Sequence, residues 1–345
     1  MIAILVGACI AGLIALVSTD KAARWMTARG LHQPINPNVP QHGHKQVPTM
    51  GGIGIMAGIL AASAVVAVAA DVGGLERALI VLLGTVGAGA VGLTDDLIKL
   101  NGRRRRMEEG ARNVNQGLTS RQKMAGLLAI GVVLGLVTMW TGAAAPVQIP
   151  FTDPVALAPS LVVVVAVALV AATANAVNLT DGIDGLAGGA AAMTFASLGL
   201  TAFWMVRHGD DYVSTDLAAV AVVSGATAAA CTGFLWWNCH PAQIFMGDAG
   251  ALGLGGALAA VALVTGTEIY LLVFAGLFVL ETLSVLVLVV AVRGFGKRPF
   301  RAPYHHELEE RMPEPRAVVR LWLVQAGFQV LALSIFYAAW LDALP

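Results

Sequence analysis

Long apolar runs separated by short polar connections dominate the sequence. A helix needs about 20 apolar residues to cross a bilayer. Runs of this kind predict ten membrane spans, at residues 2–18, 51–70, 77–94, 124–142, 157–177, 186–206, 217–236, 250–266, 269–292 and 320–340. The expected fold is therefore an all-α polytopic membrane protein, in which residues 1–345 form a single integral membrane domain.

The composition supports this interpretation. Apolar residues make up 57% of the chain and charged residues only 12%, whereas a soluble domain carries about 25% charged residues. Glycine and alanine fill many of the apolar runs, which suits closely packed membrane helices. The three cysteines lie in or beside apolar segments without a metal-ligand spacing, so we interpret them as small buried side chains.

The positive charges are distributed unequally between the connections. The connections after the first, third and ninth spans hold 4, 8 and 7 Lys or Arg residues, and those after the fifth and seventh hold none. Arg77 and Arg207 are the two basic residues on the opposite side. The positive-inside rule therefore predicts that both termini are extracytoplasmic. We interpret the run Arg103–Arg106 as facing lipid headgroups.

One polar stretch, Asn175–Leu186, follows the apolar fifth span. Its side chains Asn175, Asn178, Asp181 and Asp184 recur at every third residue, which places them roughly on one face of a helical turn. Carboxylates at the end of a membrane helix are costly unless they face protein, water or a metal ion. The stretch is therefore predicted to bind something.

Other polar motifs fall on the same, cytoplasmic side. Each has an ordinary structural explanation: the pair Asp95-Asp96 as a helix end at the headgroups, the glycine pairs as helix packing, and Phe245 as packing. Five carboxylates would nevertheless share this face, and they repel one another unless protons or a divalent cation neutralise them. They are Asp95, Asp96, Asp181, Asp184 and Asp248.

The chemistry of these groups narrows the ligand. Oxygen ligands without a cysteine or HExxH pattern favour Mg²⁺ or Mn²⁺ over zinc. Lysines and histidines nearby suit phosphate oxygens, and the membrane boundary suits one lipid substrate and one soluble, nucleotide-linked substrate. Phosphoryl transfer is the reaction class that this combination predicts, because positioning and charge neutralisation supply most of its catalysis.

These motifs resemble the polyprenyl-phosphate N-acetylhexosamine-1-phosphate transferases, over essentially the whole chain. Three motifs are typical of that family: Asp95-Asp96, Asn175-x-x-Asn178-x-x-Asp181-Gly-x-Asp184-Gly and Phe245-Met-Gly-Asp248. Four more are typical of its muramoyl-pentapeptide branch: Pro48–Gly52, Ser120–Lys123, Pro303–His306 and Pro313–Trp322.

The resemblance implies an enzyme of peptidoglycan biosynthesis in the bacterial plasma membrane. It would move phospho-N-acetylmuramoyl-pentapeptide from UDP-MurNAc-pentapeptide to undecaprenyl phosphate, giving lipid I and UMP, and would require Mg²⁺. Direct attack by the lipid phosphate is favoured, and a covalent phospho-aspartate intermediate is the alternative. A homodimer is permitted, and no nucleic-acid partner is expected.

The resemblance also implies roles for individual residues. Asp248 would be the main Mg²⁺ ligand, and Asp95 the base, supported by Asp96. His305 completes the implied catalytic set. The implied substrate-binding residues are Lys45, Lys99, Lys123, Asn175, Asn178, Asp181, Asp184, Asn238, Phe245 and His306. Among these, Asn178 and Asp181 would line the diphosphate region, whereas Asp184, Asn238 and Phe245 would form the uridine pocket.

The sequence departs from the family where three consecutive histidines are usual, because the third position is Glu307. This carboxylate either adds negative charge near a diphosphate or pairs with a neighbouring basic group.

Two alternative functions are considered for the chain. One is transfer of GlcNAc-1-phosphate from UDP-GlcNAc, and the other is a membrane transporter, which typically places its ionisable residues near the bilayer midplane.

Overall fold

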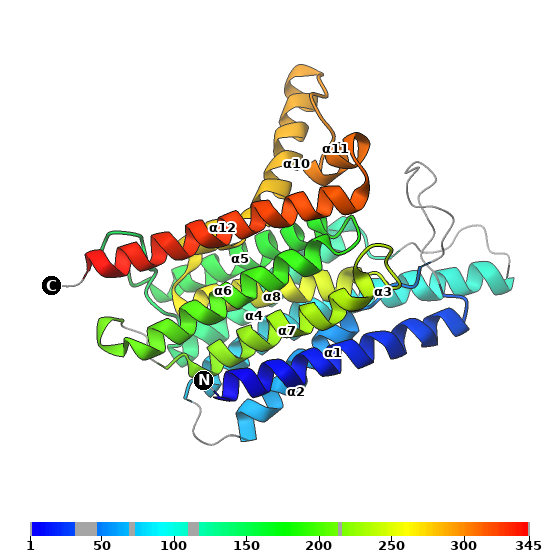
Figure 1. Cartoon of the computed structure of the whole chain (residues 1–345). Coiled ribbons are helices and arrows are strands. Elements are labelled where there is room, and N and C mark those ends of the chain that lie inside the picture. The colour runs from blue at the N-terminus through cyan, green and yellow to red at the C-terminus, as the bar shows by residue number, and fades with distance from the viewer. Residues whose placement is uncertain (1, 32–46, 69–72, 110–116, 213–215, 344–345) are drawn as a thin grey trace.

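The computed structural model describes residues 2–31, 47–68, 73–109, 117–212 and 216–343, and most of these residues lie in helices (Figure 1). The expected all-α class is confirmed. An isolated β-bridge between Val147 and Val155 lies in the connection between α4 and α5. The helices are α1 Ile2–Ala28, α2 Gly52–Val68, α3 Leu75–Glu109, α4 Ser120–Thr141, α5 Pro159–Thr180, α6 Leu186–Arg207, η1 Gly209–Asp211, α7 Ala218–Asn238, α8 Gly247–Thr265, α9 Glu268–Phe274, α10 Gly276–Phe295, α11 Tyr304–Arg311 and α12 Glu314–Asp342.

Among the described residues, 9 helices are long and apolar enough to cross a membrane. They are α1, α3 to α8, α10 and α12, and they confirm a polytopic membrane protein. The second expected span corresponds to α2, which is shorter, at 17 residues. The third expected span was placed too short, because α3 continues to Glu109 and carries Asp95 and Asp96 within the helix rather than at its end.

The glycine-rich eighth span forms the centre of the bundle. Helix α8 packs against α3 and α5, and every residue from Ala249 to Thr265 is buried (Figure 1). A Cβ atom on Gly256 would lie 2.2 Å from the carbonyl oxygen of Gly84, and one on Gly255 would lie 2.3 Å from the Cα atom of Ala174. Only glycine permits such close backbone approach, so the glycines of α8 fix its place between two neighbours.

The ninth expected span, residues 269–292, is two helices rather than one. Helices α9 and α10 meet at Ala275, and the ring of Phe328 occupies the space where a side chain on Gly276 would be, with an atom 2.3 Å from the ideal Cβ position. Beyond this break α10 projects away from the bundle, and α11 returns toward it (Figure 1). Hydropathy alone predicts one straight helix here, and that prediction is wrong.

Two glutamines of α12 explain how the break is tolerated. The Nε2 groups of Gln325 and Gln329 donate to the carbonyl oxygen of Phe274, at 2.9 and 2.7 Å, and Oε1 of Gln325 accepts from the backbone N–H of Leu277 at 2.9 Å. Backbone groups that lose helical partners in hydrocarbon must find others within the protein. The side chains that satisfy α9 and α10 therefore come from a segment about fifty residues further along the chain.

The two ends of the bundle differ in character. Helix α1 begins and α12 ends toward the same end, on the left in Figure 1. Near the end of α12, Trp204, His208, Tyr337 and Trp340 pack together, with the Trp204 and His208 ring centroids 4.0 Å apart. Aromatic rings with polar edges are typical of a membrane–water interface. That this end is extracytoplasmic stays a prediction from the charge pattern.

Candidate active site

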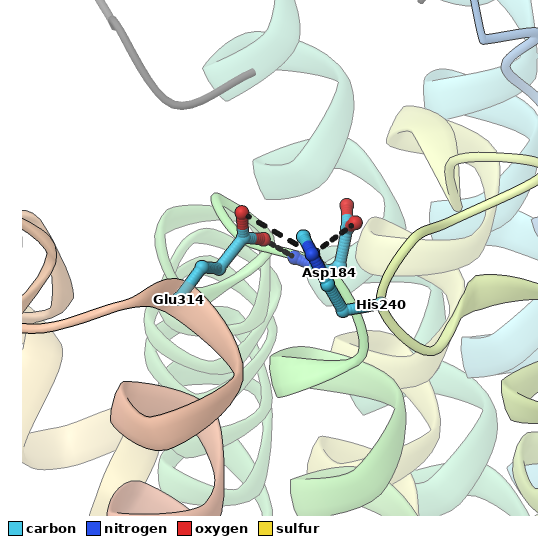
Figure 2. A group of neighbouring side chains, drawn as sticks. All are labelled: Asp184, His240 and Glu314. Atoms are coloured by element: carbon cyan, nitrogen blue, oxygen red, sulfur yellow. Dashed lines mark hydrogen bonds and ion pairs between the residues drawn. The ribbon is translucent and has the colours of Figure 1, made fainter. Parts of the chain in front are cut away.

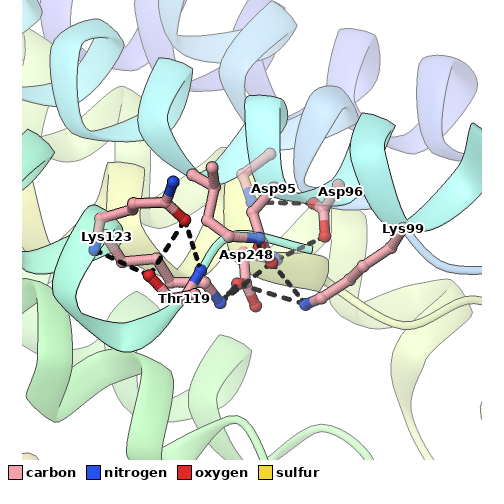
Figure 3. A network of polar contacts seen from close by, with 9 residues as sticks. Asp95, Asp96, Lys99, Thr119, Lys123 and Asp248 are labelled. Atoms are coloured by element: carbon pink, nitrogen blue, oxygen red, sulfur yellow. Dashed lines mark hydrogen bonds and ion pairs between the residues drawn. The ribbon is translucent and has the colours of Figure 1, made fainter. Parts of the chain in front are cut away.

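Three aspartates from two helices meet in one network of polar contacts, near the turn at which α8 begins (Figure 3). Asp95 and Asp96 lie on α3, and Asp248 lies in the first turn of α8. Each offers a carboxylate oxygen, and these oxygens lie within 4.8 Å of one another. Lys99 and Lys123 reach into the same group, and we call these five residues the lysine-bridged cluster.

The two lysines bridge Asp95 and Asp248. Oδ2 of Asp95 lies 2.5 Å from Nζ of Lys99 and 2.9 Å from Nζ of Lys123. Oδ2 of Asp248 lies 3.4 Å from Nζ of Lys99, and Nζ of Lys123 contacts it as well. Asp95 is fully buried, whereas the Asp248 side chain is 14% exposed. The more accessible carboxylate of the pair is therefore the one expected to be the metal ligand.

Lys123 owes its position to a helix cap. The side chain of Thr119 accepts from the backbone N–H of Gln122, and the side chain of Gln122 accepts from the backbone N–H of Thr119. This reciprocal pair of hydrogen bonds is a capping box. Just before the cap, the backbone N–H of Leu118 donates to Oδ1 of Asp95 at 2.6 Å. The start of α4 is thus fixed directly against the aspartate that its lysine contacts.

Asp96 points to α8 instead of flanking Asp95. Its carboxylate accepts from the backbone N–H groups of Asp248 and Ala249, at 3.3 and 3.0 Å. The first N–H groups of a helix have no partner within the helix, and a carboxylate is well suited to them. Gly247 has φ of +76°, and a Cβ atom there would lie 2.8 Å from Oδ2 of Asp96. Asp96 therefore holds the turn that presents Asp248.

A second group, the histidine-bridged cluster, contains Asp184, His240 and Glu314 (Figure 2). Nδ1 of His240 lies 3.1 Å from Oδ2 of Asp184 and 3.6 Å from Oε2 of Glu314. The backbone N–H of Asp184 donates to Oε1 of Glu314 at 2.8 Å, and that of Ala242 donates to Oδ2 of Asp184 at 2.9 Å. Three distant segments are joined at this point.

The negative charges of both clusters act on the carboxyl group of Asp181. Burial, together with the negative charges of Asp248, Asp96 and Asp184, raises the pKa of Asp181 to about 7. Asn178 is half-buried one turn earlier, while Nδ2 of Asn175 donates to the carbonyl oxygen of Ala171 at 2.7 Å, within its own helix. The Asn175–Leu186 stretch thus connects both clusters.

The residues expected around uridine have well-defined neighbours. Asn238 is buried, accepts from the backbone N–H of Gly185 at 3.1 Å and donates to the carbonyl oxygen of Ile244 at 2.9 Å. Phe245 is half-buried, and its backbone pairs with Pro48 and Gly51 at 2.8 Å. Asn238 therefore shapes the loop that carries Phe245, and the Pro48–Gly52 motif supports that loop.

The two histidines of α11 lie in different environments. His305 is fully buried, and its Nδ1 lies 3.3 Å from Oε2 of Glu281, which is itself fully buried in α10. The His306 side chain is 40% exposed, and its Nδ1 lies 2.8 Å from Oε2 of Glu309. The structure brings both rings together, with centroids 4.3 Å apart.

Glu307 pairs with basic neighbours. One carboxylate oxygen contacts Nη2 of Arg311, and the other accepts from the backbone N–H of Arg301 at 2.9 Å. The hydrogen bond from Arg301 and the contact with Arg311 lower the pKa of Glu307. Of the two roles considered from the sequence, pairing with a neighbouring basic group is therefore the one observed.

Sequence reasoning missed several residues with polar contacts in this region, among them Glu309, the partner of the second histidine of α11. His240 and Glu314 were each part of a motif without an assigned role, and Glu281 is a single carboxylate within an apolar run. A charge within a membrane span is a signal for a functional or structural partner. Lys45 lies outside the described residues, so its place in the site stays a prediction.

Comparison with known proteins now adds to this geometry. Residues 78–266 match the model of glycosyl transferase family 4. Phospho-N-acetylmuramoyl-pentapeptide-transferases from Mycolicibacterium vanbaalenii and Mycolicibacterium smegmatis are each 38% identical to the chain. The first comparison covers 98% of both proteins, and the second covers 99% of both. The protein of the same name from Frankia casuarinae is 36% identical, over 98% of both chains. The chain therefore belongs to glycosyl transferase family 4, together with these phospho-N-acetylmuramoyl-pentapeptide-transferases.

Proposed function

We propose that the protein transfers phospho-N-acetylmuramoyl-pentapeptide from UDP-MurNAc-pentapeptide to undecaprenyl phosphate, giving lipid I and UMP, with Mg²⁺ as cofactor. The chain is similar over nearly its full length to phospho-N-acetylmuramoyl-pentapeptide-transferases, and this similarity supports the proposed substrates. The observation that carries the proposal is the lysine-bridged cluster, where three carboxylates and two ammonium groups of α3, α4 and α8 meet.

The donor atoms of this cluster fit Mg²⁺. They are carboxylate oxygens, which Mg²⁺ prefers, and one or two of them suffice because water and substrate phosphates complete its shell. When charged, the three carboxylates outnumber the two lysines, so the cluster has negative charge left to balance a cation. Asp248 would be the principal ligand. Bound there, Mg²⁺ would neutralise the diphosphate of the nucleotide sugar.

The residues of the chain would then divide the remaining work. Lys99 and Lys123, on flexible stems, would turn from the aspartates to the substrate phosphates. Asp95, relieved of these contacts, would accept the proton of undecaprenyl phosphate. The lipid phosphate oxygen forms a bond to the β-phosphorus, the bond from that phosphorus to the bridging oxygen breaks, and UMP leaves with the electron pair.

Recognition of the nucleotide sugar would fall to the neighbouring residues. Asn178 and Asp181 would face the diphosphate, and the backbone contacts of Asp184 and Asn238 would hold the uridine pocket in shape. The half-buried ring of Phe245 would stack on uracil. Helix α11, which carries the two adjacent histidines, would lie toward the phosphates and the sugar.

The protein would act at the cytoplasmic surface of the bacterial plasma membrane. The excess of basic residues in three connections supports this orientation. Undecaprenyl phosphate would reach the cluster from the bilayer, and UDP-MurNAc-pentapeptide would reach it from the cytoplasm. Two copies would pack through glycine- and alanine-rich helices as a homodimer.

A side-by-side assay with purified protein in lipid vesicles tests the proposal. UMP release should require both Mg²⁺ and undecaprenyl phosphate, and should be much faster with UDP-MurNAc-pentapeptide than with UDP-GlcNAc. Preference for UDP-GlcNAc would reassign the substrate within the family. No release from either sugar nucleotide would favour a role without catalysis, such as transport.

The direct mechanism has a test of its own. Incubating the protein with Mg²⁺ and radiolabelled UDP-MurNAc-pentapeptide, without lipid phosphate, should leave the protein unlabelled. Recovery of a phosphorylated aspartate would show that the transfer proceeds in two steps.

A further inference from the structure

A pair of fully buried, ionisable side chains lies beside the expected site, and the reaction outlined above does not use it as a pair. Glu281 lies in α10 and His305 in α11, and both are 0% exposed. Each oxygen of the Glu281 carboxylate lies 3.2 Å from the backbone nitrogen of His305, which donates to it. Oε2 also lies 3.3 Å from Nδ1 of the His305 ring. One carboxylate therefore accepts from the backbone at the start of α11 and lies beside the ring of the second residue of that helix.

The other face of the His305 ring is packed against the Asn175–Leu186 stretch. A Cβ atom on Gly182 would lie 2.2 Å from Nε2 of His305, so the ring occupies the space where any larger residue would place its side chain. Both ring nitrogens are buried, and neither makes a hydrogen bond within the described part of the chain. His305 thus lies between α10 and the backbone next to Asp181, enclosed on both sides.

His306 has the opposite environment. Its side chain is 40% exposed, and Nδ1 lies 2.8 Å from Oε2 of Glu309, one turn along the same helix. A carboxylate at one ring nitrogen favours the tautomer with its proton there and directs the other nitrogen outward. Of the two adjacent rings, His306 is therefore the one that a phosphate or sugar can reach without rearrangement of the helix.

We propose that Glu281 and His305 form a buried positioning pair that fixes α11 against the Asp181-Gly182 turn, and that His306 is the histidine that contacts the substrate. The proposal rests on the proposed function for the nature of that substrate. It differs from the roles that the motif alone suggests, because there His305 is a catalytic residue. It also gives Glu281 a structural role, because its buried carboxylate in α10 accepts from the backbone in the first turn of α11.

Substitutions separate positioning from contact. His305→Asn keeps a side-chain N–H that can donate to Glu281, so the rate of UMP release should stay within roughly tenfold of wild type. His306→Asn should lower kcat by about 100-fold or more, with the melting temperature unchanged. Equal, large losses in both variants, with melting unchanged, would overturn the division of roles.

Glu281 offers a further test. In Glu281→Gln the amide oxygen still accepts from the backbone N–H of His305 and stays beside its ring, so kcat should stay within roughly fivefold of wild type. Glu281→Leu has similar bulk but no acceptor, and should lower kcat by about tenfold or more while KM for the nucleotide sugar changes little. Ser284→Ala is the matched control, because it removes another buried polar group of α10, the donor to the Glu281 carbonyl at 2.6 Å.

Chemical labelling gives a readout that does not depend on activity. Diethyl pyrocarbonate acylates accessible imidazole rings, and mass spectrometry locates the modified residue. In wild type and Glu281→Gln, His306 should react and His305 should be protected, whereas Glu281→Leu should expose His305. Continued protection of His305 in Glu281→Leu would overturn the positioning pair. If the wild-type protein released no UMP while this labelling pattern held, the proposed function would fail and the positioning pair would stand.

Discussion

The two polar clusters hold their carboxylates in different ways. In the lysine-bridged cluster, two ammonium groups on flexible side chains contact Asp95 and Asp248, while Asp96 accepts from backbone N–H groups of α8. In the histidine-bridged cluster, backbone N–H groups and an imidazole ring contact the carboxylates of Asp184 and Glu314. An ammonium group can move to another anion, but a backbone N–H group cannot. The first cluster is therefore suited to exchanging charge during a reaction, and the second to keeping a fixed shape for recognition.

The largest expected effect breaks the first cluster at its metal ligand. Asp248→Asn removes the charge that would hold Mg²⁺ but keeps the size of the side chain, so UMP release should fall by at least about 100-fold. Initial rates across a Mg²⁺ titration measure this. Asp210→Asn is the matched control, since Asp210 is exposed at the other end of the bundle. Near-wild-type rates at saturating Mg²⁺ would remove Asp248 from the metal site.

A second prediction uses the bridging lysine. Lys123→Met removes a positive charge shared by Asp95 and Asp248. Half-saturation by Mg²⁺ should therefore move to a lower concentration, while the maximal rate falls by about tenfold or more because a phosphate contact is lost. The neighbouring exposed residue supplies the control, Arg121→Met. Weaker Mg²⁺ binding in Lys123→Met would contradict the view that the lysine competes with the cation.

The second cluster should respond in binding rather than in metal dependence. His240→Phe removes the ring nitrogen that lies beside Asp184 and Glu314. We expect KM for the nucleotide sugar to rise by about tenfold, which corresponds to the loss of about 1.4 kcal/mol of binding free energy. Mg²⁺ half-saturation should stay constant. Cys239→Ser tests the adjacent position, which is exposed, as is Cys9, so the prediction from the sequence that both cysteines are buried is wrong. A shift in Mg²⁺ dependence with unchanged KM would show that the two clusters act together on the metal.

The smallest expected effect is at Glu307. Its carboxylate pairs with Arg311 and with the backbone of Arg301 outside both clusters, and exposed ion pairs of this kind contribute little. Glu307→His should therefore keep the rate of UMP release within about threefold of wild type, or raise it. A much larger loss would mean that the glutamate has a role of its own in the reaction.

Much of the fold could be predicted from the sequence, because membrane spans are long and apolar and their charges follow one rule. Nine of the ten expected spans contain helices long enough to cross, and α2 accounts for the other. The break between α9 and α10 could not be predicted, since Gln325 and Gln329 are distant in sequence and hydropathy does not register which backbone group a side chain will satisfy.

The candidate site was predictable in its membership but not in its connections. The motif residues Asp95 and Asp248 do meet, because α3 and α8 pack closely at their glycines. The sequence shows these glycines but does not reveal which helix each one packs against. The orientation of Asp96 toward α8 depends on two backbone N–H groups at a helix start, whose position relative to α3 no motif contains. His240 and Glu281 were missed for a similar reason, because each acquires its meaning from a residue on another helix.

The break between α9 and α10 has a consequence for how the protein is made. During synthesis the ninth segment enters the membrane before α12 exists, and at that stage nothing from α12 can bind the carbonyl group of Phe274. The uninterrupted helix that hydropathy describes is then the better conformation, because it satisfies its own backbone. Before α12 is present, only Thr194 of α6, among the side-chain donors of the described residues, can reach that carbonyl group. The placement of Glu281 and α11 at the candidate site therefore depends on contacts that α12 completes.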